Sequence, residues 1–349
     1  MTTPIEGIFE THQRVIEEGY TLPSGQQFNS YAVSNLRGGV GKSSIAFNLA
    51  YEISRHDPVL ITDVCPQCNM TEILLGDFRP KVSIYTALQP LISGPAFGDR
   101  GVEEISYRVS RYCDEFKGGK GAWMISGSPE LFAFPSTLYG QLNVAYSQRN
   151  ETAAAGLLHS LKTVLGAEAK GTESKKVLVD TSPFYAGATH LAWCAVEALI
   201  VPVRVDEHSI ESLELTFDLL SDESRDFQQW NSRAGGLPTP KVAAIVMTMV
   251  GSKSQKRATP DSASRMYIER ALALSEKYSH LFNHSNDPAK AFVLTDDFHS
   301  AGRISGYKHI PISELKIRSF HTIEGRRRLQ VNASVSRYQR QLKYLASMI

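Results

Sequence analysis

The fold of this 349-residue chain is decided by residues 35–44, which read Asn35-Leu36-Arg37-Gly38-Gly39-Val40-Gly41-Lys42-Ser43-Ser44. A short apolar run precedes this stretch and a helix-like segment follows it, so it joins a strand to a helix. Its three glycines let backbone N–H groups turn toward one point, because no Cβ blocks the approach. The following helix N-terminus carries a partial positive charge that favours an anion. The stretch therefore predicts a phosphate-binding loop.

Two side chains of the loop indicate how a nucleotide would be held. We expect Lys42 to reach the β- and γ-phosphate oxygens and the Ser43 hydroxyl to bind Mg²⁺. The ordinary form of this loop has a glycine at the position of Leu36, so the pattern here is a deviant one, with Arg37 directly before the glycines. The alternative is a glycine-rich turn without a ligand, which the flanking strand and helix patterns disfavour.

With this loop the chain resembles the ParA/MinD family of ATPases, most closely its ParA branch. That family has a signature lysine before the glycines, and the lysine reaches the phosphates of the partner subunit. Arg37 holds that position here and keeps the charge on a planar, forked head. The resemblance implies that Lys42 and Arg37 assist catalysis. It also implies a nucleotide-binding set of Arg37, Gly38, Gly39, Val40, Gly41, Lys42, Ser43 and Ser44.

Two further apolar runs, residues 59–63 and 176–180, each end in an aspartate. The first continues into a Pro-Gln-x-Asn run that resembles the family motif, and the resemblance assigns to Asp63 the orientation of the attacking water. The second ends in Asp180, and a buried strand that ends in a carboxylate is typical of a Walker B magnesium site. We therefore predict Mg²⁺ at Ser43 and Asp180. A helix cap is the alternative role for Asp180.

Cys65 and Cys68 have the spacing of a redox or metal-binding pair. A zinc site needs two more ligands, and the sequence has no second close pair. The surrounding match to the ATPase motif therefore favours a structural role. The four cysteines do not suggest a disulfide framework, no run approaches the roughly 20 apolar residues of a membrane span, and no secretory signal is visible at the N-terminus. We expect a cytoplasmic protein.

Alternation of apolar strands with helical patterns predicts an α/β fold, a P-loop NTPase with a mostly parallel central sheet and helices on both faces. We expect an N-terminal helical extension over 1–29 and the ATPase domain over 30–349, with 76–122 as a variable elaboration. Thr248 and Met249 follow a strand, and the resemblance places them near the adenine. Helices are predicted over 5–18, 84–92, 102–115, 152–165 and 331–347, and the last strand over 291–294.

The last 49 residues, 301–349, hold ten lysines and arginines against two acidic residues. Their net charge of +8 leaves −7 for the preceding residues, since the whole chain carries +1. A basic end on an acidic body suggests a polyanionic partner. A solvated helix face is the alternative. Together with the resemblance, this favours non-specific DNA contact by Arg326, Arg327, Arg328, Arg337, Arg340 and Lys343.

The resemblance implies an ATP- and Mg²⁺-dependent switch that forms a homodimer when ATP is bound and then holds DNA. A cargo or adaptor protein would trigger slow hydrolysis, and the switch would partition DNA or position a cargo. One alternative is a metabolic or metal-cluster maturation enzyme on the same fold. A paired ligand set or a small-molecule pocket would support this alternative. Another is MinD-like membrane positioning, but core packing explains the apolar side of the final helix, so no membrane partner is expected.

Overall fold

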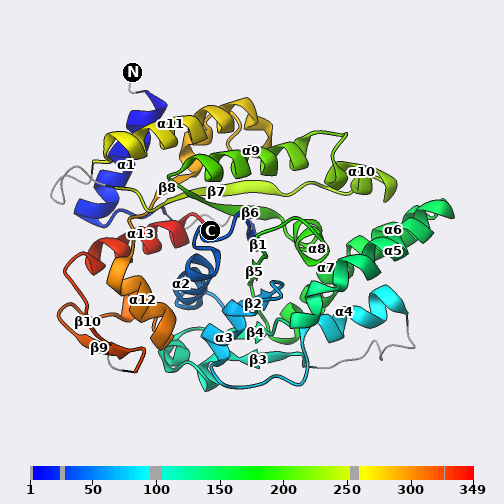
Figure 1. The fold of residues 1–349 in the computed structure, drawn as a ribbon, viewed down its shortest axis with the longest axis horizontal. Coiled ribbons are helices and arrows are strands. Elements are labelled where there is room, and N and C mark those ends of the chain that lie inside the picture. The colour runs from blue at the N-terminus through cyan, green and yellow to red at the C-terminus, as the bar shows by residue number, and fades with distance from the viewer. Residues whose placement is uncertain (1–2, 24–27, 95–103, 252–258, 326) are drawn as a thin grey trace.

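The computed structural model describes residues 3–23, 28–94, 104–251, 259–325 and 327–349, and its centre is an eight-stranded sheet (Figure 1). The strands are β1 (Ser30–Val33), β2 (Val59–Asp63), β3 (Ser106–Arg108), β4 (Ala122–Ile125), β5 (Lys176–Asp180), β6 (Ala198–Arg204), β7 (Lys241–Thr248) and β8 (Phe292–Leu294). Their order is β3-β4-β2-β5-β1-β6-β7-β8, and every pair is parallel except β3 with β4. The predicted mostly parallel α/β fold is confirmed.

Side chains of the central strands alternate between two apolar layers. Tyr31 and Val33 of β1 pack into one layer, whereas Ala32 between them packs into the other. This period of two is the geometry of a strand that is buried on both faces. Such strands appear in sequence as unbroken apolar runs, which is why they were recognisable.

Helices cover both faces of the sheet, as predicted. One layer receives α2 (Lys42–Ser54), α3 (Asn69–Leu75) and α13 (Val335–Ser347). The other receives α4 (Ile84–Ser93), α5 (Phe134–Ser147), α6 (Glu151–Leu158), α7 (Ser160–Gly171), α8 (Ala188–Ala195), α9 (Glu207–Ser221), α10 (Asp226–Arg233) and α11 (Ser262–Lys277). Helix α1 (Pro4–Glu18) lies beside β8 and contacts both layers through Ile8 and Val15.

Two helix predictions between the motifs are wrong in detail. The predicted helix over 102–115 begins outside the described residues, and from residue 104 on it is contradicted by β3 and by the 3-10 helices η2 (Val109–Arg111) and η3 (Asp114–Gly118). Here β3 pairs antiparallel with β4 and forms the edge of the sheet. The helix over 152–165 is interrupted at His159, where α6 ends and α7 begins. Further 3-10 helices are η4 (Pro129–Phe132), η5 (Ser279–Leu281), η6 (Pro288–Ala291) and η7 (Ile312–Glu314).

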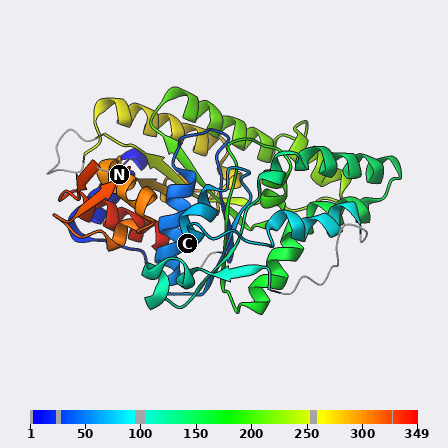
Figure 2. The ribbon, with the colours of Figure 1, turned by 60° about the horizontal axis from the view of Figure 1, so that its bottom comes forward.

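The C-terminal region forms a small unit with its own core beside α2 (Figure 2). It contains α12 (His299–Lys308), η7 and an antiparallel hairpin of β9 (Phe320–Ile323) and β10 (Arg327–Gln330), followed by α13. The predicted helix over 331–347 begins at Val335. Asn48 of α2 accepts a hydrogen bond from the Ile312 N–H at 2.7 Å, which ties this unit to the helix that follows the glycine loop.

Candidate nucleotide-binding site

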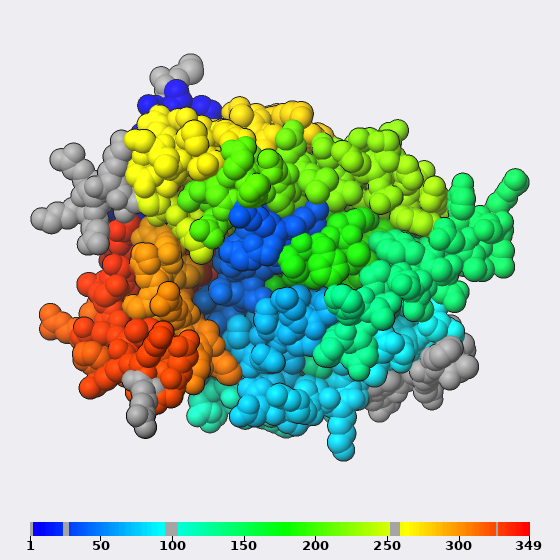
Figure 3. Space-filling model, in the orientation of Figure 1, coloured from blue at the N-terminus to red at the C-terminus, as the bar shows by residue number. Residues whose placement is uncertain are grey.

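The glycine loop connects β1 to α2 at the carboxyl edge of the sheet, where the blue segment of the chain reaches the surface near the middle of one face (Figure 3). Gly39 and Gly41 have φ angles of 76° and 91°, in the left-handed region that favours glycine. Within the described part of the chain, the N–H groups of residues 38–44 donate to no protein acceptor. They are therefore free to bind an anion at the helix N-terminus.

Lys42 folds over the loop that precedes it. Its ammonium donates to the carbonyl oxygens of Asn35 at 2.9 Å and Arg37 at 2.7 Å. Since an ammonium has three donors, one remains for a phosphate oxygen. Burial lowers the pKa of Lys42 to about 8, and nearby Asp180 acts in the opposite direction.

Ser43 and Asp180 meet as predicted for a magnesium site. The Ser43 hydroxyl donates to Asp180 Oδ2 at 2.7 Å. The other carboxylate oxygen, Oδ1, is buried and has no hydrogen-bond partner among the described residues. Hard oxygen ligands at the end of a buried strand suit Mg²⁺, so these residues fit the ion.

Asp63 and Asp180 are register partners on neighbouring strands and both are fully buried. Burial raises the pKa of each carboxyl, and the charge of Asp63 raises that of Asp180 further. Asp63 is held by the N–H groups of Cys65 and Thr71 and by the Thr71 hydroxyl, each at 3.0 Å. The structure thus brings Asp63 beside the Ser43–Asp180 pair, although its oxygens accept hydrogen bonds from the segment that follows β2.

Arg37 turns toward its own chain. Its Nη1 contacts Asp206 Oδ1 and lies 3.1 Å from the Ser209 hydroxyl. Asp206 caps α9 by accepting from the Ser209 N–H at 3.0 Å. The resemblance gave no reason to expect this contact, since it assigned Arg37 to the phosphates.

Sequence reasoning missed two residues that build the site. Asn35 is fully buried, donates to the Pro202 carbonyl at 2.7 Å, and accepts from the Arg37 N–H and the Ser212 hydroxyl at 2.8 Å each. Thr71 joins Asp63 to the Gly127 N–H, which it accepts at 2.8 Å. The signal that the sequence offered for Asn35 was its position between an apolar run and the glycine loop.

Thr248 lies against the glycine loop. Its hydroxyl donates to the Val40 carbonyl at 3.3 Å, and Met249 follows with a φ of 59°. The end of β7 therefore lies beside the loop, on the side away from Asp63. Contact of these two residues with an adenine stays a prediction.

Cys65 and Cys68 stand at the ends of a tight turn, with the Cys68 N–H donating to the Cys65 carbonyl at 3.0 Å. Both are free thiols, and burial raises the pKa of Cys65 to about 11 and that of Cys68 to about 12. Reactive cysteines have lowered pKa values instead. No group of three or more His, Cys, Asp or Glu side chains placed to bind a metal occurs among the described residues.

Of the six residues predicted to contact DNA, the five described ones lie on two elements, β10 and α13. Arg327 and Arg328 are exposed on β10, and Lys343 is exposed on α13, whereas Arg326 lies outside the described residues. Arg337 pairs with Asp296 at 2.8 Å with only 14% of its side chain exposed. Arg340 donates to backbone carbonyls at the end of α1. Since these two arginines hold elements together, we leave them out of the proposed DNA surface.

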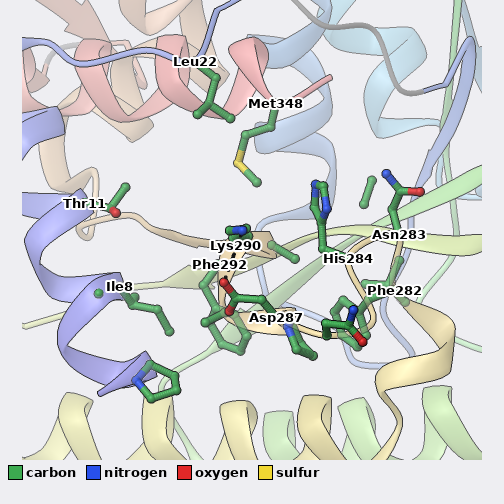
Figure 4. A pocket seen from close by; sticks show the side chains of 18 of the residues that line it. Ile8, Thr11, Leu22, Phe282, Asn283, His284, Asp287, Lys290, Phe292 and Met348 are labelled. Carbon is green, nitrogen blue, oxygen red and sulfur yellow. Dashed lines mark ion pairs between the residues drawn. The ribbon is translucent and has the colours of Figure 1, made fainter. Parts of the chain in front are cut away.

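A separate cavity of about 680 Å³ lies between α1, the start of β8 and the end of α13 (Figure 4). Apolar side chains such as Phe282 and Met348 line it together with the ion-paired Asp287 and Lys290. Val242 at the start of β7 also lines it, so the cavity lies toward the amino ends of the strands, away from the glycine loop. In the described residues, no helix combines the length and the apolar character that crossing a membrane requires.

A parallel sheet with a glycine loop between strand and helix, a lysine over that loop and a Ser–Asp pair beside it defines a P-loop NTPase. The family model of the CobQ/CobB/MinD/ParA nucleotide-binding domain matches residues 31–275, and the chain belongs to this family. No curated protein matches the sequence.

Several solved structures share the fold. McdA of Cyanothece, in complex with ATP, is 16% identical with a TM-score of 0.58, covering 83% of this chain and 91% of that one. DIP2308 of Corynebacterium diphtheriae is 16% identical with a TM-score of 0.56, covering 80% and 98%. A Borrelia burgdorferi protein assigned to plasmid partition, bound to AMPPNP, is 14% identical with a TM-score of 0.51, covering 93% and 100%. At these identities the likeness concerns the fold.

Proposed function

We propose that the protein is an ATP- and Mg²⁺-dependent ATPase switch of the ParA type, which pairs with a second copy when ATP is bound. It would hold DNA non-specifically in that state and partition DNA or position a cargo in the cytoplasm. The observation that carries the proposal is the site around Lys42, where loop N–H groups that have no acceptor among the described residues adjoin the hydrogen-bonded Ser43–Asp180 pair. Family membership supports nucleotide binding.

Each residue of the site would have a separate role in phosphoryl transfer. The loop N–H groups and the remaining donor of Lys42 would bind phosphate oxygens, which positions the nucleotide and neutralises its charge. Ser43 and Asp180 would hold Mg²⁺, which when bound supplies further neutralisation of phosphate charge. Asp63 would orient the attacking water, and Thr71 keeps its carboxylate in place. Thr248 and Met249 would lie beside the adenine.

The proposed DNA surface is the β9–β10 hairpin. Arg327 and Arg328 are exposed there, and Arg318 before the hairpin is exposed as well. Phe320 is half exposed, and the Arg328 guanidinium lies 4.3 Å from its ring centroid. Cationic side chains interleaved with an aromatic ring suit a nucleic-acid backbone and its bases.

The experiment is to size the purified protein with ATP, with ADP and without nucleotide, each with Mg²⁺ and with or without DNA. We expect a dimer only with ATP, and DNA retention only in that state. Lys42→Ala should remain a monomer under all conditions, because the loop then lacks its phosphate contact. A wild-type protein that ignores ATP, or a Lys42→Ala variant that still pairs, would overturn the proposal.

A second candidate is an ATP-dependent synthase that carries a small substrate beside the nucleotide. A cavity of about 450 Å³ favours it, because it lies next to Asp63 at the carboxyl ends of β2 and β4. Its lining includes Thr71, Arg79, Lys81 and Ser126. ATP turnover that stays slow until a small carboxylic acid or amide is added, with no effect of DNA, would favour this candidate over the switch.

A further inference from the structure

The basic residue of the glycine loop already has a partner within its own chain. Arg37 contacts Asp206 through Nη1, and each of the two side chains is 28% exposed. The Ser209 hydroxyl is a second acceptor at 3.1 Å from the same nitrogen. The resemblance to the ParA/MinD family assigns this guanidinium to the phosphates of ATP, and with that role in the proposed function a carboxylate and a phosphate would compete for it.

Asp206 does not depend on Arg37 for its own stability. Its Oδ2 lies 3.3 Å from Nε of Arg204, and its Oδ1 accepts the Ser209 N–H at 3.0 Å. Partial burial acts to raise the pKa of Asp206, but the Ser209 hydrogen bonds and the Arg37 charge outweigh it and hold the pKa below its usual value. Because Asp206 keeps these partners when Arg37 leaves, no buried carboxylate is left unpaired, and the free-energy cost of breaking the Arg37–Asp206 contact is small.

The backbone of Arg37 is fixed independently of its side chain. Its N–H donates to Asn35 at 2.8 Å, and its carbonyl accepts from Lys42 at 2.7 Å. The guanidinium of Arg37 contacts other described residues only through Nη1, so its Nε and Nη2 donors have no partner among them. A change of side-chain torsion thus moves the charge away from Asp206 without disturbing the loop.

We propose that Asp206 is a positioning residue that holds Arg37 in its own subunit while the loop is empty and releases it to phosphate charge when ATP and a second copy assemble. The inference rests on the proposed function and specifies its regulation. The Asp206 charge would then set the concentration at which the ATP-bound protein pairs, because the paired state must first free Arg37.

The first test is Asp206→Asn, which removes the charge but keeps a good helix cap. Asp261→Asn is the matched control, since Asp261 caps α11 through the Ser264 N–H at 2.7 Å in the same Asp-x-x-Ser pattern. We expect Asp206→Asn to lower the midpoint concentration for ATP-dependent pairing and the KM for ATP by about three- to tenfold, with kcat per dimer unchanged. Asp261→Asn should change neither. In an Arg37→Ala background the effect should vanish.

The inference is overturned if Asp206→Asn pairs no more readily than the wild type, or if the gain persists without Arg37. The second test needs no pairing. In nucleotide-free protein, phenylglyoxal should modify Arg37 at least about threefold faster in Asp206→Asn than in the wild type, as followed by peptide mass spectrometry with Arg225 as internal reference. Equal modification rates would refute the claim that Asp206 retains Arg37, whether or not the wild type dimerises. A wild type that never dimerises would refute the proposed function instead.

Discussion

Asp63 and Asp180 lie opposite each other at the ends of neighbouring strands, and neither is exposed to solvent. Two buried carboxylates on adjacent register positions disfavour each other's charged form. Only Asp63 is compensated by hydrogen bonds to both oxygens, whereas Asp180 Oδ1 has no partner among the described residues. The buried charge of Asp180 is therefore unfavourable in the empty site, and a bound cation would offset it.

Replacing Asp180 by Asn tests this residue. The folded state raises the pKa of Asp180, so it binds the proton more tightly than the unfolded chain, whose carboxyl has a pKa of about 3.9. Stability from this group is therefore lost as pH rises from about 4 through the raised pKa, by about 1.4 kcal/mol for each pH unit that separates the folded and unfolded pKa values. Asn stays neutral, so we expect nucleotide-free Asp180→Asn to melt higher than the wild type at pH 8, with a smaller advantage at pH 5.

The same variant should lose the stabilisation that Mg²⁺-ATP gives the wild type, because an amide is a poor magnesium ligand. Melting curves with and without Mg²⁺-ATP measure both effects. Asp222→Asn, on an exposed carboxylate, is the control and should keep the ATP effect. A destabilised Asp180→Asn that still responds to Mg²⁺-ATP would contradict the assignment.

Lys42 predicts a proton linkage. Its pKa is about 8 in the empty loop, and bound phosphates raise it. ATP affinity should therefore be greatest below pH 8 and fall as pH rises above it, with proton uptake on binding that is small at pH 7 and approaches about one proton near pH 9. Calorimetry in buffers of different ionisation enthalpy measures the uptake. Lys42→Arg, which stays charged, should take up fewer protons than the wild type where it binds. Equal uptake in both proteins would exclude Lys42 as its source.

At the scale of elements, the sequence allowed prediction of those parts whose chemistry is local. The loop of residues 35–44, the strands that end in Asp63 and Asp180, and the two-sided sheet follow from glycine placement and from unbroken apolar runs. The contact between Arg37 and Asp206 could not be predicted, because the two residues are 169 positions apart in the sequence. Nothing in either local pattern specifies the other.

The C-terminal elements show the opposite case. A charge run was visible, but a short hairpin with two exposed arginines lacks the apolar alternation by which strands are recognised. Arg337 was among the residues predicted to contact DNA, yet tertiary packing covers most of its side chain and pairs it with Asp296. Helical spacing specifies which residues share a face, but not which neighbour covers that face.

The hairpin predicts a charge-dependent DNA contact. Arg327→Glu with Arg328→Glu should weaken retention of ATP-loaded protein on DNA and reduce the slope of log affinity against log salt by about 2, because each phosphate contact contributes roughly one. Fluorescence anisotropy with a DNA duplex at several salt concentrations measures both. Lys162→Glu with Lys170→Glu on α7 makes the same charge change at exposed positions and should have little effect. Equal losses in the two double variants would indicate general repulsion instead of a hairpin contact.

At the scale of the whole molecule, the nucleotide site and the C-terminal unit share one helix. Helix α2 begins at Lys42 in the glycine loop, and its later residues bond to η7. Asn48 accepts the Ile312 N–H, Tyr51 donates to Glu314, and Glu52 accepts the Ser313 hydroxyl. A displacement of α2 on nucleotide binding would therefore be passed directly to the unit that carries the hairpin.

Nucleotide-driven pairing has a consequence that concerns the entire fold. A ligand that binds only the folded state raises the melting temperature, and if that state is a dimer, the rise depends on protein concentration. We therefore expect the midpoint in Mg²⁺-ATP to increase with each tenfold increase in protein, whereas the midpoints in Mg²⁺-ADP and without nucleotide stay constant. Scanning calorimetry over a hundredfold range of protein concentration measures this. Lys42→Ala should give a midpoint independent of both ATP and concentration. If the wild type is stabilised equally by ATP at every concentration, the nucleotide binds a monomer, and a small-substrate reaction beside Asp63 becomes the better account of the site.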